Sequence, residues 1–191
     1  MINIFYEDLP TTITANGTKY KIVTDFREWL RFADMIEDNS LTVYEKISLL
    51  SNWIYDVPKT LTQEIISSVF SFYRADELEP LNNGDEYDDD SVKTPPLLNW
   101  RIDAKYIIGD FLKHYGIDLL SAEMHWWKFQ CLLISLPDSS NVQKRIAYRG
   151  ADLSKIKNRS ERDRIAKIQR QLSIPFEISD EDIGNILGGD L

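Results

Sequence analysis

Few side chains in this sequence have the type and spacing that catalysis or metal binding requires. The only histidines, His114 and His125, do not show the i, i+4 spacing of paired ligands on one helix face. Cys131 is the only cysteine, so a cysteine-based zinc site cannot form. Cys131 also precedes Leu132 and Leu133 and has no basic neighbour, which favours a core position over a nucleophile. The sequence therefore predicts no catalytic, cofactor-binding or metal-binding residue.

Two acidic motifs come closest to ion-binding chemistry. The run Asp85–Asp90 suggests calcium, but Tyr87 takes a ligand position and no glycine supplies the sharp turn of a calcium loop. A solvated loop is therefore favoured there. Asp103 and Lys105, with Asp90 upstream, resemble the last element of a metal-dependent nuclease site. Because this triplet begins a helix instead of lying on a buried strand, a nuclease is the least favoured alternative.

Charge is segregated along the chain. The formal net charge is −9, yet residues 141–171 contain ten Lys or Arg and three Asp or Glu, a local balance of +7. This stretch is either a solvated helical face or a docking surface for an acidic segment, of this chain or of a partner. Nucleic acid is disfavoured, because the overall charge is negative and the basic stretch has few aromatic residues. Lys155, Arg159 and Arg162 are its candidate partner-binding residues.

Apolar anchors could provide further contacts with a partner. Trp126 and Trp127 are adjacent, so on a helix their side chains point about 100° apart. Either both are buried, or Trp126 faces a partner. Residues 173–191 form an acidic tail that is either frayed or folds in a partner's groove. The candidate contacts in this tail are apolar: Phe176, Ile183, Ile186 and Leu187.

The elements that would position these residues begin with β-structure. Residues 2–6 could form a short strand, and the runs 11–15 and 18–23 flank Asn16 and Gly17. Asn-Gly between two β-prone runs is typical of a type I′ hairpin, because both residues tolerate a positive φ.

Helical periodicity follows the hairpin. Helices are expected after caps at Asp25 and Thr42, each with Glu three residues on, and over 61–74. Further helices are expected over about 119–136, 141–149 and 153–172, and one between a cap at Asp103 and a stop at Gly116. The expected core contains Trp29, Phe72, Tyr106, Phe111, Trp127 and Leu132.

These patterns predict a mainly α, α+β protein, with an N-terminal hairpin or small sheet followed by about six or seven helices. The segment 76–96 is rich in acids and proline and is expected to be a mobile loop inserted in a single domain, 1–172. No basic leader or long apolar run is present, so we expect a soluble intracellular protein without a membrane contact.

Four sequence blocks resemble the bacteriophage gene-product-fifteen family, whose members occur in phages and prophages of Gram-positive bacteria. They are residues 25–30 (DFREWL), 115–119 (YGIDL), 125–129 (HWWKF) and 148–149 (YR). Genes of this family typically lie between those of the major tail protein and the tape-measure protein.

The resemblance implies a non-enzymatic tail assembly chaperone in the host cytoplasm. Its partner would be the tape-measure protein or, alternatively, the tail-tube protein, and the chain could also form a homo-oligomer. The alternative is a structural virion component, such as a tail completion or connector protein. The resemblance supplies no catalytic residues.

Overall fold

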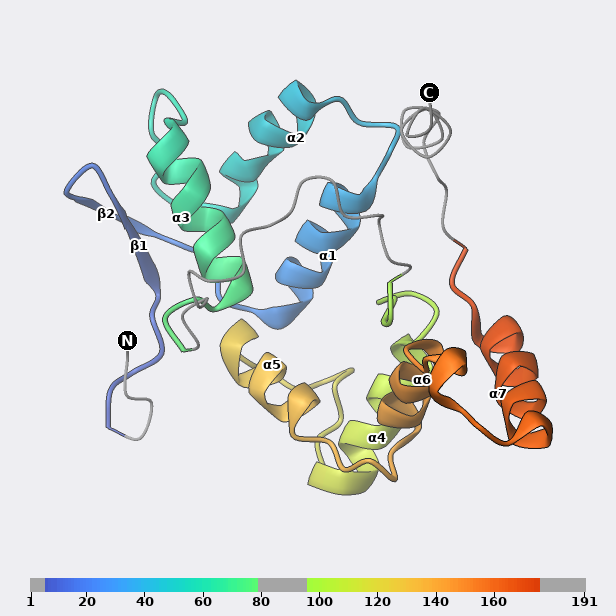
Figure 1. Cartoon of the computed structure of the whole chain (residues 1–191). Coiled ribbons are helices and arrows are strands. Elements are labelled where there is room, and N and C mark those ends of the chain that lie inside the picture. The colour runs from blue at the N-terminus through green and yellow to red at the C-terminus, as the bar shows by residue number, and fades with distance from the viewer. Residues whose placement is uncertain (1–5, 79–95, 176–191) are drawn as a thin grey trace, which may run out of the picture. The chain divides into compact units, whose positions relative to one another are not determined.

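The computed structural model describes residues 6–78 and 96–175 (Figure 1). The chain forms two compact units. Unit 1 comprises Met1–Asp85 and Ser121–Ser135, and unit 2 comprises Glu86–Leu120 and Leu136–Leu191. A small two-stranded sheet precedes seven α-helices, so the predicted mainly α class is confirmed. The single domain predicted over residues 1–172 stays a prediction. Most of the acidic segment 76–96 lies outside the described residues. Of the strand predicted over residues 2–6, only Tyr6 is described.

Unit 1 begins with the predicted hairpin. Strands β1 (Thr12–Ala15) and β2 (Thr18–Lys21) pair antiparallel, with Ile13 opposite Tyr20. Asn16 and Gly17 have φ angles of 50° and 71° and form the tight turn between them. These positive angles are those that a type I′ turn requires, so the Asn-Gly signal is confirmed.

Helices α1 (Phe26–Glu37), α2 (Val43–Leu49), α3 (Gln63–Arg74) and α5 (Trp126–Ile134) complete unit 1, with the 3-10 helix η1 (Leu50–Trp53) after α2. The caps explain where α1 and α2 begin. Asp25 accepts a hydrogen bond from the amide of Arg27, and Thr42 and Glu45 form the predicted capping box.

The core of unit 1 is aromatic. Trp29 is fully buried, with its ring centroid 5.0 Å from that of Phe72 and 5.1 Å from that of Phe32. From α5, Phe129 stacks on Phe26 of α1 at 4.8 Å. Such contacts contribute beyond the burial of their area, so these rings hold α1, α3 and α5 together.

The predicted start of the fifth helix at Leu119 is wrong, because α5 begins only at Trp126. Backbone pairing explains the difference. The amide of Phe26 donates to the carbonyl of Met124, and the amide of Trp126 donates to the carbonyl of Thr24. These bonds hold the chain extended just before α5, and no local pattern reveals them.

Unit 2 contains α4 (Ala104–Tyr115), α6 (Asn141–Arg149), the 3-10 helix η2 (Leu153–Lys155) and α7 (Arg159–Leu172). Gly116 terminates α4 with φ of 67°, as predicted. The predicted seventh helix is divided into η2 and α7, because Asn158 caps α7 by accepting from the amide of Glu161.

A buried carboxylate joins α4 to α6. Asp110 of α4 is fully buried and accepts hydrogen bonds from the amide of Val142 at 2.8 Å and from Asn141 Nδ2 at 2.9 Å. A negative charge is favourable at the first turn of a helix, so Asp110 stabilises the start of α6 and fixes its position against α4.

Candidate functional site

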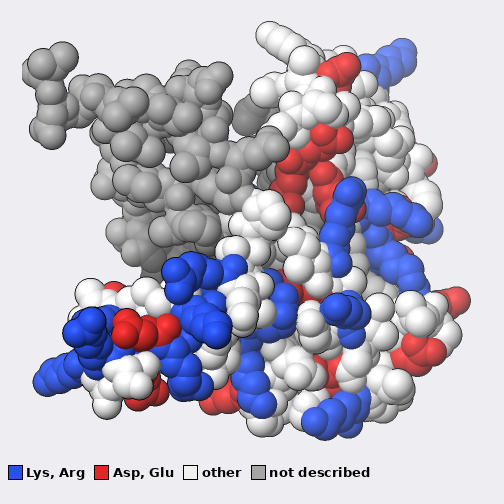
Figure 2. Space-filling view, turned by 90° about the vertical axis from the view of Figure 1, so that its right-hand side faces the viewer, with Lys and Arg blue, Asp and Glu red and all other residues white. Residues whose placement is uncertain are grey.

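The basic helix α7 presents most of its cationic side chains to solvent. Residues 159–172 carry five basic and two acidic residues, and none of the side chains in α7 is fully buried. Its C-terminal part is held to unit 2, because Arg149 Nε donates to the carbonyl of Leu172 and Gln169 Nε2 donates to that of Ala151, both at 2.8 Å. Figure 2 shows many basic side chains on the face of the molecule that it presents.

The three predicted basic contacts all lie at the surface. Lys155 and Arg159 are 83% and 89% exposed and form only long ion pairs, with Asp152 at 3.4 Å and Asp163 at 3.9 Å. Arg162 is exposed and has no ion-pair partner among residues 6–78 and 96–175. Exposed pairs of this kind contribute about 0–1 kcal/mol, so all three cations are accessible to a partner.

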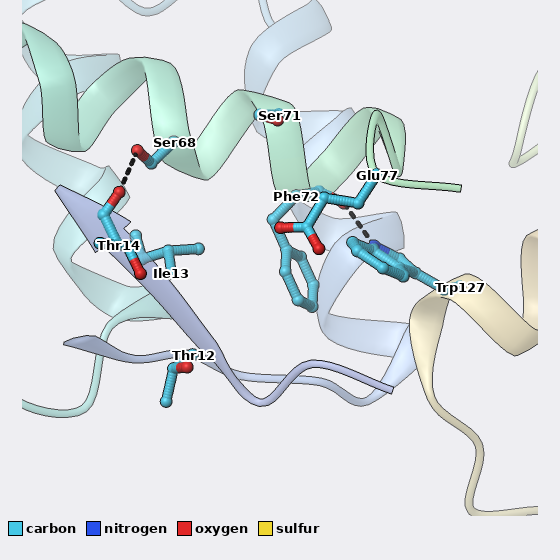
Figure 3. Close-up of a pocket in the computed structure, with 8 residues that line it drawn as sticks. All are labelled: Thr12, Ile13, Thr14, Ser68, Ser71, Phe72, Glu77 and Trp127. Carbon is cyan, nitrogen blue, oxygen red and sulfur yellow. Dashed lines mark hydrogen bonds between the residues drawn. The ribbon is translucent and has the colours of Figure 1, made fainter. Parts of the chain in front are cut away.

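Trp126, in contrast, does not lie at the surface. Its side chain is 1% exposed, its ring stacks on Tyr73, and its Nε1 donates to the carbonyl of Tyr73 at 2.7 Å. Trp127 is equally buried and donates to the carbonyl of Phe72 (Figure 3). Both indoles therefore bind the C-terminal carbonyls of α3, and the assignment of Trp126 to a partner contact is corrected.

The remaining predicted contacts, Phe176, Ile183, Ile186 and Leu187, lie outside the described residues. Of the expected core residues, Trp29, Phe72, Phe111 and Trp127 are buried. Tyr106 and Leu132 are only half-buried, which differs from the prediction. The guanidinium of Arg145 lies 4.3 Å above the ring of Tyr106, so a cation covers the face that was expected to meet apolar side chains.

Helix α2 exposes apolar side chains that sequence reasoning missed. Tyr44 is 86% exposed and Val43 is 69% exposed, and no residue of α2 is fully buried. The hydrogen bonds of the Thr42 hydroxyl and amide lower the pKa of Glu45, which keeps this cap charged. One signal for this surface was available in the sequence. The capping box at Thr42 and Glu45 places Val43 and Tyr44 in the first turn of α2.

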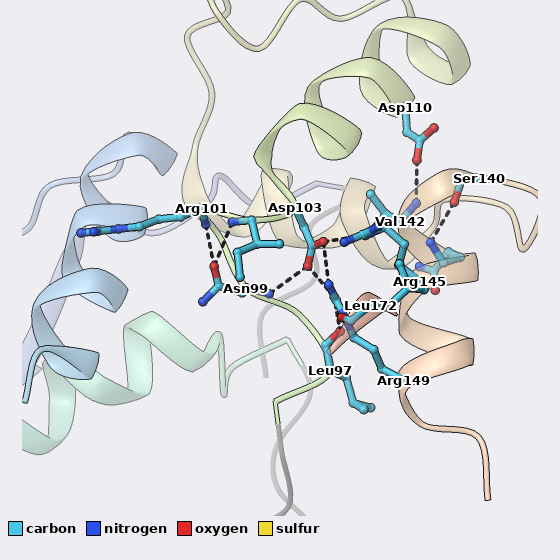
Figure 4. A network of polar contacts seen from close by, with 12 residues as sticks. Leu97, Asn99, Arg101, Asp103, Asp110, Ser140, Val142, Arg145, Arg149 and Leu172 are labelled. Atoms are coloured by element: carbon cyan, nitrogen blue, oxygen red, sulfur yellow. Dashed lines mark hydrogen bonds and ion pairs between the residues drawn. The ribbon is translucent and has the colours of Figure 1, made fainter. Parts of the chain in front are cut away.

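Asp103 is a buried structural anion (Figure 4). It stands before α4, but its carboxylate caps no amide there, so the predicted capping role is wrong. Arg149 instead binds both carboxylate oxygens, at 2.5 and 3.0 Å, and Arg145 Nε donates at 2.7 Å. The amide of Asn99 adds a bond of 3.0 Å. Burial alone would raise the pKa of Asp103, but the bonds from Arg149, Asn99 and Arg145 outweigh it and lower the pKa.

This geometry opposes the nuclease alternative. Both oxygens of Asp103 accept hydrogen bonds from arginine, and a metal ion would have to displace them. Within the described parts of the chain, no cluster of three His, Cys, Asp or Glu residues could hold a metal ion. Asp90, the second carboxylate of that alternative, lies outside the described residues.

His125 and Cys131 have the surroundings of structural groups. His125 Nδ1 accepts from the amide of Trp127 at 3.1 Å, so it caps α5, while Nε2 lies 2.9 Å from the carbonyl of Pro10. One neutral tautomer, with the proton on Nε2, satisfies both contacts. Burial raises the pKa of the Cys131 thiol and so disfavours the nucleophilic thiolate.

Unit 1 is expected to lose stability as the pH falls below about 6.5, the pKa of an unperturbed histidine. Burial lowers the pKa of His125, and the Pro10 contact only partly opposes this. The unfolded chain therefore binds a proton at a higher pH than the folded chain does. Stability from this group is complete above the unfolded pKa and declines through the window beneath it. Urea midpoints at pH 7.5 and 5.5, read by tryptophan fluorescence, measure the change.

His125→Asn is the matched control, because asparagine retains an N-cap acceptor and does not titrate. The urea midpoint of the variant should depend less on pH than that of the wild-type protein. If the urea midpoint of the variant changed with pH as much as that of the wild-type protein, groups other than His125 would be responsible for the pH response.

The described residues thus define a mainly helical protein with exposed basic and apolar surfaces. The chain matches the family model described as Bacteriophage Gp15 protein over residues 5–174, and it therefore belongs to this phage family. This finding confirms the resemblance carried by the sequence blocks. Comparison with curated proteins gave no match, and comparison with solved structures gave none. No helix in the described parts of the chain has the length and apolar character needed to cross a membrane.

Proposed function

We propose that this phage protein is a non-enzymatic tail assembly chaperone that binds the tape-measure protein in the host cytoplasm. The observation that carries the proposal is the exposure of Val43 and Tyr44 on α2, a helix with no fully buried residue. The family supports a phage structural or assembly role, and the gene position implied by the resemblance supports the tail.

The physical basis is the solubility of a long helical partner. Before the tail tube encloses it, a tape-measure protein exposes apolar helix stripes that favour aggregation. Apolar side chains on α2 could cover such a stripe, as helices do in hydrophobic grooves. The net charge of −9 would then keep the complex in solution.

The basic surface of η2 and α7 offers a second contact of different character. Lys155, Arg159 and Arg162 are exposed and could bind acidic segments of the tape-measure or tail-tube protein. Their effect would be mainly on the rate of association and on specificity, because exposed charges steer encounters more than they add affinity. The tail residues Phe176, Ile183, Ile186 and Leu187 remain candidate contacts in this proposal.

Replacing both Val43 and Tyr44 with serine is expected to abolish most of the solubilising effect. Both side chains are exposed, so the free energy of unfolding should change by no more than about 0.5 kcal/mol per site. The assay is co-expression with the tape-measure protein, read as the soluble fraction of that partner. Ile134→Ser is the control, because Ile134 is 74% exposed on α5 and lies outside α2.

A soluble fraction that the wild-type protein does not raise would contradict the chaperone proposal. Equal losses for the α2 variant and the Ile134 variant would contradict the assignment to α2.

The alternative is a structural virion component, which family membership supports equally. Mass spectrometry of purified virions separates the two functions. A chaperone should be absent from mature particles and recovered with the tape-measure protein from infected cells. Retention in particles at a fixed ratio to a tail protein would favour the structural role.

A further inference from the structure

Helix α6 presents a groove on the side that does not contact Asp103. Arg145 and Arg149 lie on one side of the helix and bind Asp103 there. The groove follows the other side and has a volume of about 530 Å³. We call it the α6 groove, and its lining residues are Asp138, Gln143, Lys144, Ile146, Ala147 and Tyr148.

An apolar stripe runs along the α6 groove. Ile146 and Ala147 follow Gln143 at positions i+3 and i+4, so the three residues share one helix face. Ala147 is exposed and Ile146 is half-buried. Gly150 is one further turn along this face, and a Cβ atom there would lie 3.5 Å from each terminal methyl carbon of Leu97, which is 43% exposed. The stripe therefore continues to the C-terminal end of α6.

The described chain ends close to this end of α6. Arg149, the last residue of α6, donates from Nε to the carbonyl of Leu172 at 2.8 Å (Figure 4). Ile174 is buried, so the chain is still held to unit 2 two residues before the tail 176–191 begins. Helix α6 rises only about 9 Å from residue 143 to residue 149. A tail of this length can span about 50 Å when extended, so it can reach the whole groove.

The composition of the tail complements that of the groove. Residues 176–191 contain five acidic residues and no Lys or Arg, whereas residues 141–171 have a balance of +7. Lys144 lines the groove, is exposed and has no ion-pair partner within residues 6–78 and 96–175. The acidic lining residue Asp138 precedes α6, at the end farther from Arg149. The tail also supplies apolar side chains for the stripe, from Phe176, Ile178, Ile183, Ile186 and Leu187.

We propose that the α6 groove binds the C-terminal tail 176–191 of the same chain. Apolar side chains of the tail cover Ile146 and Ala147, and a carboxylate of the tail pairs with Lys144. Because the tail is tethered beside the groove, its effective concentration there is high and individually weak contacts are sufficient. The proposal concerns the free protein and goes beyond the proposed function, since it requires neither α2 nor a tape-measure protein. A partner that contacts these tail residues must first displace them from the groove.

Paramagnetic broadening from a nitroxide on the tail tests this proposal in the full-length ¹⁵N-labelled protein. Cys131→Ser removes the only cysteine of the chain, and Asn185→Cys supplies the attachment point for the nitroxide. We expect selective broadening of the amide signals of Ala147 and Tyr148. The same sample with the nitroxide chemically reduced provides the reference intensities.

Two exposed lysines of unit 2 provide a matched pair of variants. Lys144→Gln should lower the equilibrium constant for docking about two- to fivefold, the range set by an exposed ion pair, and so weaken the broadening. Lys113→Gln removes the same charge from an exposed site on α4, outside the groove lining, and should leave the broadening unchanged. Ile186→Ser combined with Leu187→Ser should abolish selective broadening, because it removes two apolar contacts without changing the groove.

Three results would overturn the proposal. Broadening spread evenly over the signals of unit 2 would show that the tail has no preferred site. Equal effects of Lys144→Gln and Lys113→Gln would show a charge attraction that does not depend on the groove. The third result uses a mixture of ¹⁵N-labelled protein without nitroxide and unlabelled protein with nitroxide. Selective broadening at Ala147 and Tyr148 in this mixture would show that the tail of a second copy occupies the groove.

Discussion

Replacing Asp103 with asparagine is expected to lower the free energy of unfolding of unit 2 by about 3–5 kcal/mol. Asp103 is fully buried, and the side chains of Arg149 and Arg145 are only 4% and 14% exposed. The substitution leaves two buried cations without their counterion, and that cost exceeds the value of the lost hydrogen bonds. Hydrogen exchange of α4 and α6 amides, followed by mass spectrometry, measures the loss locally.

Asp163→Asn is the control for this prediction. Asp163 pairs with Arg159 at 3.9 Å and its side chain is 70% exposed, so the change should be within about 0.5 kcal/mol. If Asp103→Asn were equally neutral, the buried ion pairs would contribute nothing to unit 2.

Replacing Trp127 with alanine is expected to lower the free energy of unfolding of unit 1 by about 3–5 kcal/mol, the usual cost of a large core cavity. Trp127 is 1% exposed and its ring lies 5.2 Å from that of Phe72. Urea denaturation followed by far-ultraviolet circular dichroism measures the change.

Trp127→Phe separates the contribution of the indole N–H to stability from the contribution of the aromatic ring. It removes the 2.7 Å bond to the carbonyl of Phe72, which still accepts from the amide of Ala75 at 3.1 Å. The expected cost is about 1 kcal/mol from the lost bond, plus the smaller ring volume. Ile134→Ala, an exposed change on the same helix, should have little effect. Equal losses for the alanine and phenylalanine variants would assign the stability to the hydrogen bond alone.

Local signals in the sequence were sufficient where the interaction itself is local. The hairpin turn at Asn16 and Gly17, the capping box at Thr42 and the stop at Gly116 each depend on residues within one turn, and each is confirmed. The start of α5 depends on backbone bonds between residues 24–26 and 124–126, so helical periodicity placed it too early.

The candidate sites show the same contrast between local and long-range interactions. The basic character of α7 is evident from residue types, and its exposure agrees with them. Burial of Trp126 depends on the carbonyl of Tyr73, which is 53 residues earlier in the chain.

Arg149 has a consequence for how unit 2 is tied together. Its guanidinium binds the carbonyls of Leu97 and Leu172 as well as Asp103, which lie 52, 23 and 46 residues away. One side chain thus closes three loops and acts as a noncovalent cross-link. Each closure costs conformational entropy, but this cost rises only slowly with loop length, so closing the 46- and 52-residue loops costs little more than closing the 23-residue loop. Arg149 is therefore a position at which the loss of a single side chain would release three separate stretches of backbone.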